Sequence, residues 1–187
     1  MNDLSPGFSS ALDVQICFRA LLNAYSTPGQ AVTVPTPLTP PPGLSPACAA
    51  LLLTLADAQT KIALAPEHPA RGWLVFHTGA LVSGIGVSDF VVATDRPALA
   101  ALRQGTDETP EDGATLILDT GIAAPTRLFR LSGPGLKAPV TLPLPLDEGF
   151  LAEWRAQART APRGVDLLLC AGARVLALPR SLHIEEG

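Results

Sequence analysis

The segment GVDLLLCAGARVLALP, residues 164–179, decides the fold. Two apolar runs, residues 165–169 and 175–178, flank an Ala-Gly-Ala stretch that is typical of a hairpin turn. Strands without polar alternation are usually covered on both faces. We therefore expect an α/β fold in which a mixed β-sheet is sandwiched between helices, in three layers.

Helical patterns occur on both sides of this segment. Asp13 is predicted as the N-cap of a first helix, and Ser45 followed by Pro46 is a typical helix start. Asp147 is predicted to cap a helix whose apolar stripe precedes the hairpin. A shorter helix is expected between Asp95 and Gly105. These helices can supply the two covering layers.

Further strands are expected between the helices. The predicted strands are residues 30–34, 61–65, 90–93, 114–118 and 127–131. Residues 73–78 are bulky and strand-like, and they lead into a turn. Residues 35–46 contain six prolines in twelve positions, which predicts an extended surface loop.

Composition limits the function classes. The 187 residues are 47% hydrophobic and 16% charged, which fits one folded domain over residues 1–187. No apolar run is long enough to span a membrane, and the first residues do not resemble an export signal. A net charge of −4 without a basic run offers little to nucleic acid. We expect a cytoplasmic protein with no membrane or nucleic-acid partner.

No complete catalytic or metal-binding motif is present. The sequence lacks a Walker loop, an extended GxGxxG, a GxSxG elbow and HExxH, and its three histidines are scattered. The cysteines Cys17, Cys48 and Cys170 have no metal-ligand spacing and read as buried free thiols of a reducing compartment. We predict no catalytic residue and no metal site.

Two polar residues in apolar surroundings remain as candidates. His77 follows the strand-like run and precedes Thr78-Gly79, so a ligand contact and a structural hydrogen bond both fit it. Arg180 has apolar flanks, where an unpaired guanidinium is costly. Its partner is predicted to be a carboxylate or carbonyl groups of the chain, or else an anionic ligand or another subunit.

Seven segments together carry a family resemblance. They are residues 18–22 with 26–29, 51–57, 76–78 with 81–83, 105–106, 110–118, 131–136, and 164–167 with 178–180. In this order they resemble the H subunit, or PhnH family, of the bacterial carbon–phosphorus lyase system. The resemblance runs from about Ala11 to Ile184, and its main departure is the proline-rich segment at residues 35–46.

The resemblance implies a role in the use of phosphonates as a phosphorus source. Members of the family resemble a shortened pyridoxal-phosphate transferase fold, form homodimers and join the G, I and J subunits in a core complex. That complex is associated with forming α-D-ribose 1-methylphosphonate 5-triphosphate from ATP and methylphosphonate.

The lysines provide an independent argument about the cofactor. Pyridoxal phosphate needs a Schiff-base lysine. Lys61 begins a predicted strand and Lys137 follows a glycine turn, and neither has a recognisable phosphate cup beside it. We expect no cofactor.

Two roles follow from these observations. The first is an accessory, non-catalytic subunit of a multi-subunit transferase or lyase complex, acting mainly in assembly. The second is a subunit with its own phosphonate- or nucleotide-binding site, for which Arg19, His77 and Arg180 are the candidates because arginine suits oxyanions. A stand-alone transferase is disfavoured by the missing motifs.

Overall fold

The computed structural model describes residues 5–35, 38–120 and 126–187. Its helices are α1 (Ala11–Ser26), α2 (Pro46–Leu55), α3 (Arg71–Thr78) and α4 (Glu148–Ala158), with short 3-10 turns η1 (Ile85–Val87), η2 (Leu99–Ala101) and η3 (Pro110–Asp112). Its strands are β1 (Val32–Thr33), β2 (Lys61–Ala63), β3 (Leu81–Val82), β4 (Phe90–Ala93), β5 (Thr115–Asp119), β6 (Arg127–Ser132), β7 (Val140–Leu144), β8 (Asp166–Ala171), β9 (Arg174–Leu178) and β10 (His183–Glu186). None of the helices in these ranges is long and apolar enough to cross a membrane.

Two sheets form the framework. The larger has the strand order β1-β9-β8-β5-β4-β2-β3, and the smaller has the order β10-β6-β7. Strands β2, β3, β4, β5 and β8 are parallel, and β9 runs against them. Strand β1 pairs antiparallel with β9, so it runs in the same direction as the parallel strands. The large sheet is therefore mixed, as the sequence predicts, and the apolar segment forms its β8–β9 hairpin.

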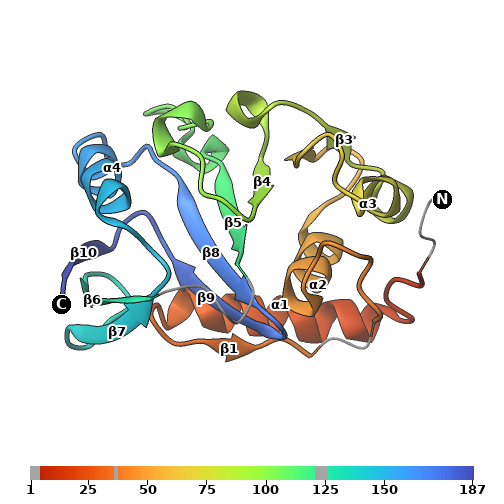
Figure 1. Ribbon diagram of the computed structural model, residues 1–187, viewed down its shortest axis with the longest axis horizontal. Coiled ribbons are helices and arrows are strands. Elements are labelled where there is room, and N and C mark those ends of the chain that lie inside the picture. The colour runs from red at the N-terminus through yellow and green to blue at the C-terminus, as the bar shows by residue number, and fades with distance from the viewer. Residues whose placement is uncertain (1–4, 36–37, 121–125) are drawn as a thin grey trace.

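The two faces of the large sheet have different covers. Helices α1, α2 and α3 pack on one face, with Trp73 and Leu52 fully buried beneath them. On the other face lie α4, the η2 turn and the small sheet, with Trp154 and Phe129 in the core. Figure 1 shows α4 and the small sheet at one end of the molecule and α3 with β3 at the other. The prediction of three layers is confirmed, except that one outer layer also contains a sheet.

Strands β7 and β10 of that small sheet are not predicted from the sequence. Pro143 interrupts β7, and proline in a run argues against a central strand. The structure accommodates it because β7 is an edge strand, which pairs with β6 alone among the described strands. β10 is the sequence HIEE, whose outward side chains leave only Ile184 in the core. Edge strands of this kind carry little hydrophobic signal.

Residues 73–78 form the last six of the eight residues of helix α3, so the prediction of a strand there is wrong. Bulky and β-branched residues favour strands in isolation, but here burial of Trp73 and Leu74 against α2 decides. The helix ends at Gly79, which adopts a left-handed φ of 71° and donates its N–H to the Val75 carbonyl. That glycine is the helix-end signal in the sequence.

The start of one helix and the length of another also differ from the predictions. Helix α1 is capped by Ser10, whose hydroxyl accepts from the Asp13 N–H, and the Asp13 carboxylate accepts from the Ser10 N–H in return. Asp13 is thus the third helical residue of a capping box rather than the N-cap. The helix expected between Asp95 and Gly105 is a single 3-10 turn. The caps at Ser45 and Asp147 are confirmed.

The proline-rich segment lies between β1 and α2. Apart from Thr36 and Pro37, which lie outside the described residues, residues 35–45 form neither helix nor strand, as predicted. Pro46 begins α2 as its first helical residue.

Candidate functional site

Arg19 lies on helix α1. Its side chain is exposed and makes no ion pair or side-chain hydrogen bond with the part of the chain that the structure describes. The neighbouring Phe18 and Leu22 are exposed on the same helix. Arg19 is thus a cation within an apolar surface, and its binding role stays a prediction.

His77 lies near the end of α3 and not at the end of a strand. Its Nε2 atom lies 3.0 Å from the Ser5 carbonyl oxygen, which also accepts a 2.7 Å hydrogen bond from the Trp73 indole N–H. The imidazole packs against Trp73 and Phe76, with ring centroids 4.8 and 5.0 Å apart. These contacts attach the segment at Ser5 to α3. They correspond to the structural hydrogen bond that was one of the two interpretations of His77.

Arg180 forms a clamp between three segments. Its Nη1 donates to the carbonyls of Pro110 and Gly164, at 2.8 and 2.7 Å. Its Nη2 lies 3.0 Å from the Asp166 carboxylate, which also accepts the Arg180 backbone N–H. The predicted need for a carboxylate or carbonyl partner is met within the chain. The cavities described below are lined by none of the three candidates Arg19, His77 and Arg180.

Cavities follow the edge where the parallel strands end. We name them the switch-point cavity, beside the ends of β2 and β4; the middle cavity, beside β4 and β5; and the hairpin cavity, beside β5 and the β8–β9 turn. The first two share Thr94 and Asp95, and the last two share Thr120 and Pro145. Ligands of open α/β sheets bind at this carboxyl edge. The edge is therefore the candidate functional site.

The switch-point cavity, of about 400 Å³, lies where the chain reverses its direction of travel across the sheet. From β2 the chain continues through α3 to β3, which is the neighbour of β2 on the side away from β4. From β4 it continues through η2 to β5, which is the neighbour of β4 on the side away from β2. Helix α3 and η2 cover opposite faces of the sheet. Adjacent strands whose connections leave on opposite faces form a crevice at their carboxyl ends.

His68, Asp95 and Asp119 are the ionisable residues of this cavity. Burial lowers the pKa of His68, although the Gly43 backbone and the Asp119 charge act in the opposite direction. The His68 Nδ1 accepts the Ala70 N–H at 3.2 Å, so the neutral ring carries its proton on Nε2. Two carboxylates beside a neutral imidazole favour hydrogen-bond donors and disfavour phosphate.

Asp119 also has a structural role. Its Oδ2 accepts the Ser45 N–H at 2.7 Å, which links the end of β5 to the start of α2. Contact with the Cys170 thiol, together with burial, raises the pKa of Cys48, and the charge of nearby Asp119 adds to the increase. Cys48 and Cys170 are fully buried free thiols, as predicted.

The middle cavity, of about 620 Å³, contains Arg96 and Arg127, both already engaged. Arg96 forms a 2.8 Å ion pair with Glu153 and a 3.4 Å contact with Asp147. Arg127 forms a 2.7 Å ion pair with Glu148. These pairs hold α4 against the sheet. They also occupy hydrogen-bond donors of both guanidinium groups and weaken the attraction of either group for an anion.

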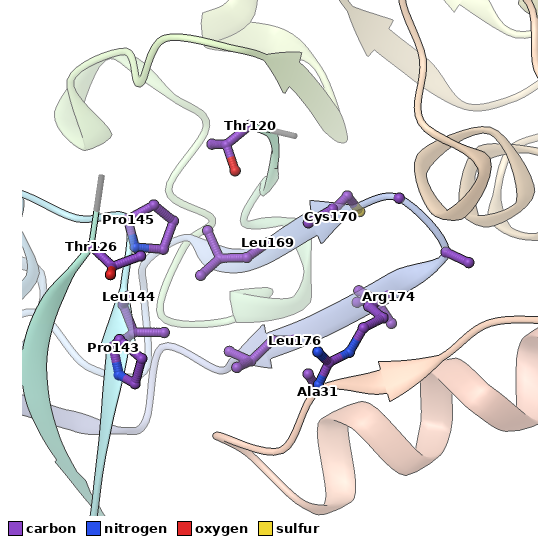
Figure 2. A pocket seen from close by; sticks show the side chains of 14 residues that line it. Ala31, Thr120, Thr126, Pro143, Leu144, Pro145, Leu169, Cys170, Arg174 and Leu176 are labelled. Atoms are coloured by element: carbon purple, nitrogen blue, oxygen red, sulfur yellow. The ribbon is translucent and has the colours of Figure 1, made fainter. Parts of the chain in front are cut away.

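The hairpin cavity, of about 620 Å³, is mainly apolar (Figure 2). Leu169 and Leu176, which face each other across the β8–β9 pair, belong to its floor. Residues 143–145 at the end of β7 form a wall. Arg174 is the one charged side chain among the fourteen described residues that line it.

A comparison with known families identifies the chain. Residues 6–185 match the model of the bacterial phosphonate metabolism protein family PhnH. The chain belongs to the PhnH family.

Two relatives agree with this assignment across nearly the full length. The first is 32% identical over 186 residues, covering 92% of this chain and 90% of the relative, and is the α-D-ribose 1-methylphosphonate 5-triphosphate synthase subunit PhnH of Rhizobium meliloti strain 1021. The second is 33% identical over 176 residues, covering 91% and 85%, and is the putative C-P lyase subunit protein HtxG of Stutzerimonas stutzeri. The family resemblance seen in the sequence is confirmed.

Sequence reasoning missed the residues that line the carboxyl edge of this PhnH-family chain. Asp119 directly follows a buried strand, and the carboxyl-end rule applied to residues 114–118 points to it. Nothing in the sequence marks Arg174 or His68, because their place depends on which strands are neighbours. Within the described residues, no group of three or more His, Cys, Asp or Glu side chains is placed to hold a metal ion.

Proposed function

We propose that this chain is an accessory subunit of the carbon–phosphorus lyase core complex, which forms α-D-ribose 1-methylphosphonate 5-triphosphate from ATP and methylphosphonate. Membership of the PhnH family and the names of both relatives support this role. Its work is assembly: it pairs with itself and joins the G, I and J subunits. The chain acts as one domain over residues 1–187 in the cytoplasm.

The outer face of α1 is the observation that carries the assembly role. Leu12, Ile16, Phe18 and Leu22 are 40–60% exposed. The inner face of the same helix is buried, through Cys17, Ala20, Leu21 and Ala24. A helix that is apolar on both sides is normally covered on both sides. We define these four exposed residues as the α1 surface and assign it to self-pairing, in which a helix packs against its two-fold copy.

A second apolar surface lies near the β3 edge of the large sheet. Its residues are Val75, Phe76, Leu81, Ile85 and Val87, which are 41–67% exposed. Among the described residues, strand β3 pairs only with β2, so its other side is an open sheet edge. We define these five residues as the β3-edge surface and assign it to a different subunit.

An accessory role also agrees with the state of the polar side chains. Arg180, Arg96 and Arg127 are bonded to groups of this chain, and Asp119 caps the loop before α2. These bonds stabilise the subunit and leave the chemistry of the complex to other chains.

The proposed kinship with a shortened pyridoxal-phosphate transferase fold rests on the mixed sheet covered on both faces. The lysines do not fit the cofactor itself. Lys61 begins β2 and Lys137 lies between β6 and β7, and both side chains are exposed. Neither lines a cavity of the carboxyl edge. We therefore route no chemistry through pyridoxal phosphate.

Complementation tests this proposal. A bacterium that has a carbon–phosphorus lyase but lacks its own H subunit is grown with methylphosphonate as the only phosphorus source. Expression of this chain should restore growth, and growth on phosphate serves as the control. In a second arm, all partner subunits are taken from the same operon as this chain. If growth on methylphosphonate still fails in that arm while growth on phosphate is normal, the proposal is wrong.

A further inference from the structure

The cover over one face of the β8–β9 hairpin stops short of the turn. Alternate β9 residues, Arg174, Leu176 and Leu178, point toward the face covered by α4 and the small sheet. Leu178 is completely buried there and Leu176 is 8% exposed, but Arg174 lies beyond the cover and is exposed. The hairpin cavity is the space left at this boundary.

The shape and lining of the hairpin cavity suit a small molecule. Its volume of about 620 Å³ lies within the range usual for ligand pockets, which are mostly apolar with a few polar groups. Leucine, proline and alanine side chains make most of its wall. Polar atoms come from Thr120, Thr126 and Arg174, which Figure 2 places around the apolar floor.

Charge decides what kind of molecule fits. Within the described ranges, Arg174 makes no ion pair and no side-chain hydrogen bond. No carboxylate is among the fourteen lining residues, so the cavity is positive. The middle cavity differs because its arginines are paired, and the switch-point cavity differs because it contains two carboxylates. Along this edge the hairpin cavity is therefore the place that favours an anion.

We propose that the hairpin cavity binds an organic phosphonate or phosphate, with its apolar part on Leu169 and Leu176 and its anionic group on Arg174. A planar guanidinium binds two oxygens of such a group at once. The inference rests on the proposed function, because a complex that uses ATP and methylphosphonate exposes this subunit to phosphonates and nucleoside triphosphates. It adds a ligand site of this subunit's own.

Calorimetric titration of the purified full-length chain tests the site with phenylphosphonate, ATP and inorganic phosphate. At least one organic probe should bind about tenfold more tightly than inorganic phosphate, because only the organic probes fill the apolar part. Tight binding of phenylphosphonate identifies a phosphonate site, and tight binding of ATP alone identifies a nucleotide site.

Two variants locate the binding. Arg174→Ala should weaken the organic probe about 10- to 100-fold, whereas Arg174→Lys, which keeps the charge, should weaken it less. Ala31→Leu narrows the cavity and should weaken the organic probe without weakening inorganic phosphate. Arg159→Ala is the matched control, because Arg159 is also exposed and unpaired within the described residues, and lies at the end of α4.

The inference is overturned if neither organic probe binds more tightly than inorganic phosphate. It is also overturned if Arg174→Ala and Arg159→Ala weaken binding equally. Arg174 belongs to neither the α1 surface nor the β3-edge surface, so Arg174→Ala should still assemble with partner subunits. Loss of binding with normal assembly is expected, whereas failed assembly of the unmodified chain counts against the proposed function instead.

Discussion

Arg180 shows how a residue that looks like a ligand contact becomes a structural centre. The sequence indicates that its charge needs a partner, and the structure supplies Asp166 and two carbonyls. The Arg180 and Asp166 side chains are only 20% and 17% exposed. At that burial, removing one partner leaves the other charge uncompensated.

Arg180→Ala should therefore lower the free energy of unfolding by about 3 kcal/mol. Urea unfolding followed by circular dichroism measures the change. The double variant Arg180→Ala/Asp166→Ala should lose less than the sum of the two single losses, because the pair is coupled. An unchanged midpoint in Arg180→Ala would show that the clamp does not stabilise the fold.

Gly113 lies directly beneath that clamp. A Cβ at this position would collide with the Gly164 carbonyl oxygen and the Arg180 Nη1. Gly113→Ala should therefore destabilise the protein by about 1–3 kcal/mol, as overpacking does. Gly84→Ala is the control, because nothing lies within 4 Å of a Cβ there and its φ is −75°. Equal thermal midpoints for the two variants would contradict the clamp geometry.

His68 should make stability depend on pH. Its folded-state pKa is lowered from 6.5, so the unfolded chain takes up a proton at a higher pH than the folded chain does. The free energy of unfolding should therefore fall as pH drops through 6.5, until the folded pKa is passed. His68→Gln should flatten this part of the profile, measured by urea unfolding between pH 5 and 8. A profile of the same slope in both proteins would exclude His68 as its source.

At the scale of elements, hydrophobic pattern and cap chemistry predict much of the framework. The β8–β9 hairpin, the start of α2 at Ser45 and the start of α4 at Asp147 all follow from local signals. The small sheet does not, because Pro143 and the charged β10 hide edge strands. The helical conformation of α3 depends on burial of Trp73 in the core, which the local sequence does not indicate.

The candidate site is less predictable than the framework, because neighbouring strands assemble it. Thr94 and Asp119 come from different strand ends, and Arg174 comes from the antiparallel return of the hairpin. Sequence spacing does not bring them together. Strand order does, so only the general rule about carboxyl edges was available beforehand.

The α1 surface yields a prediction at this scale. Ile16→Glu and Phe18→Glu place charge on its apolar residues and should convert the proposed dimer to a monomer of 19.4 kDa. Light scattering after size-exclusion chromatography measures the mass. Leu128→Glu is the control, since it adds the same charge at an exposed apolar position of β6, outside the α1 surface. A persistent dimer in both surface variants would assign self-pairing to another face.

At the scale of the whole molecule, the described part of the chain is a well-packed α/β core with two clusters of exposed apolar residues. The α1 surface and the β3-edge surface lie on different elements. The cavities of the carboxyl edge contain no residue of the α1 surface, whereas the switch-point cavity shares Ile85 with the β3-edge surface. Separate surfaces allow one chain to meet a copy of itself and a different subunit together. This arrangement supports the assembly role that family membership suggests.

Co-expression of this chain with the G, I and J subunits, followed by affinity purification and native mass spectrometry, tests that role most directly. The unmodified chain should be recovered in the complex, and Phe76→Glu, on the β3-edge surface, should be lost from it while remaining folded. Leu128→Glu is the matched control, because Leu128 is 56% exposed on β6, outside both surfaces. Recovery of the Phe76→Glu chain in the complex at the same stoichiometry as the unmodified and Leu128→Glu chains would contradict the account.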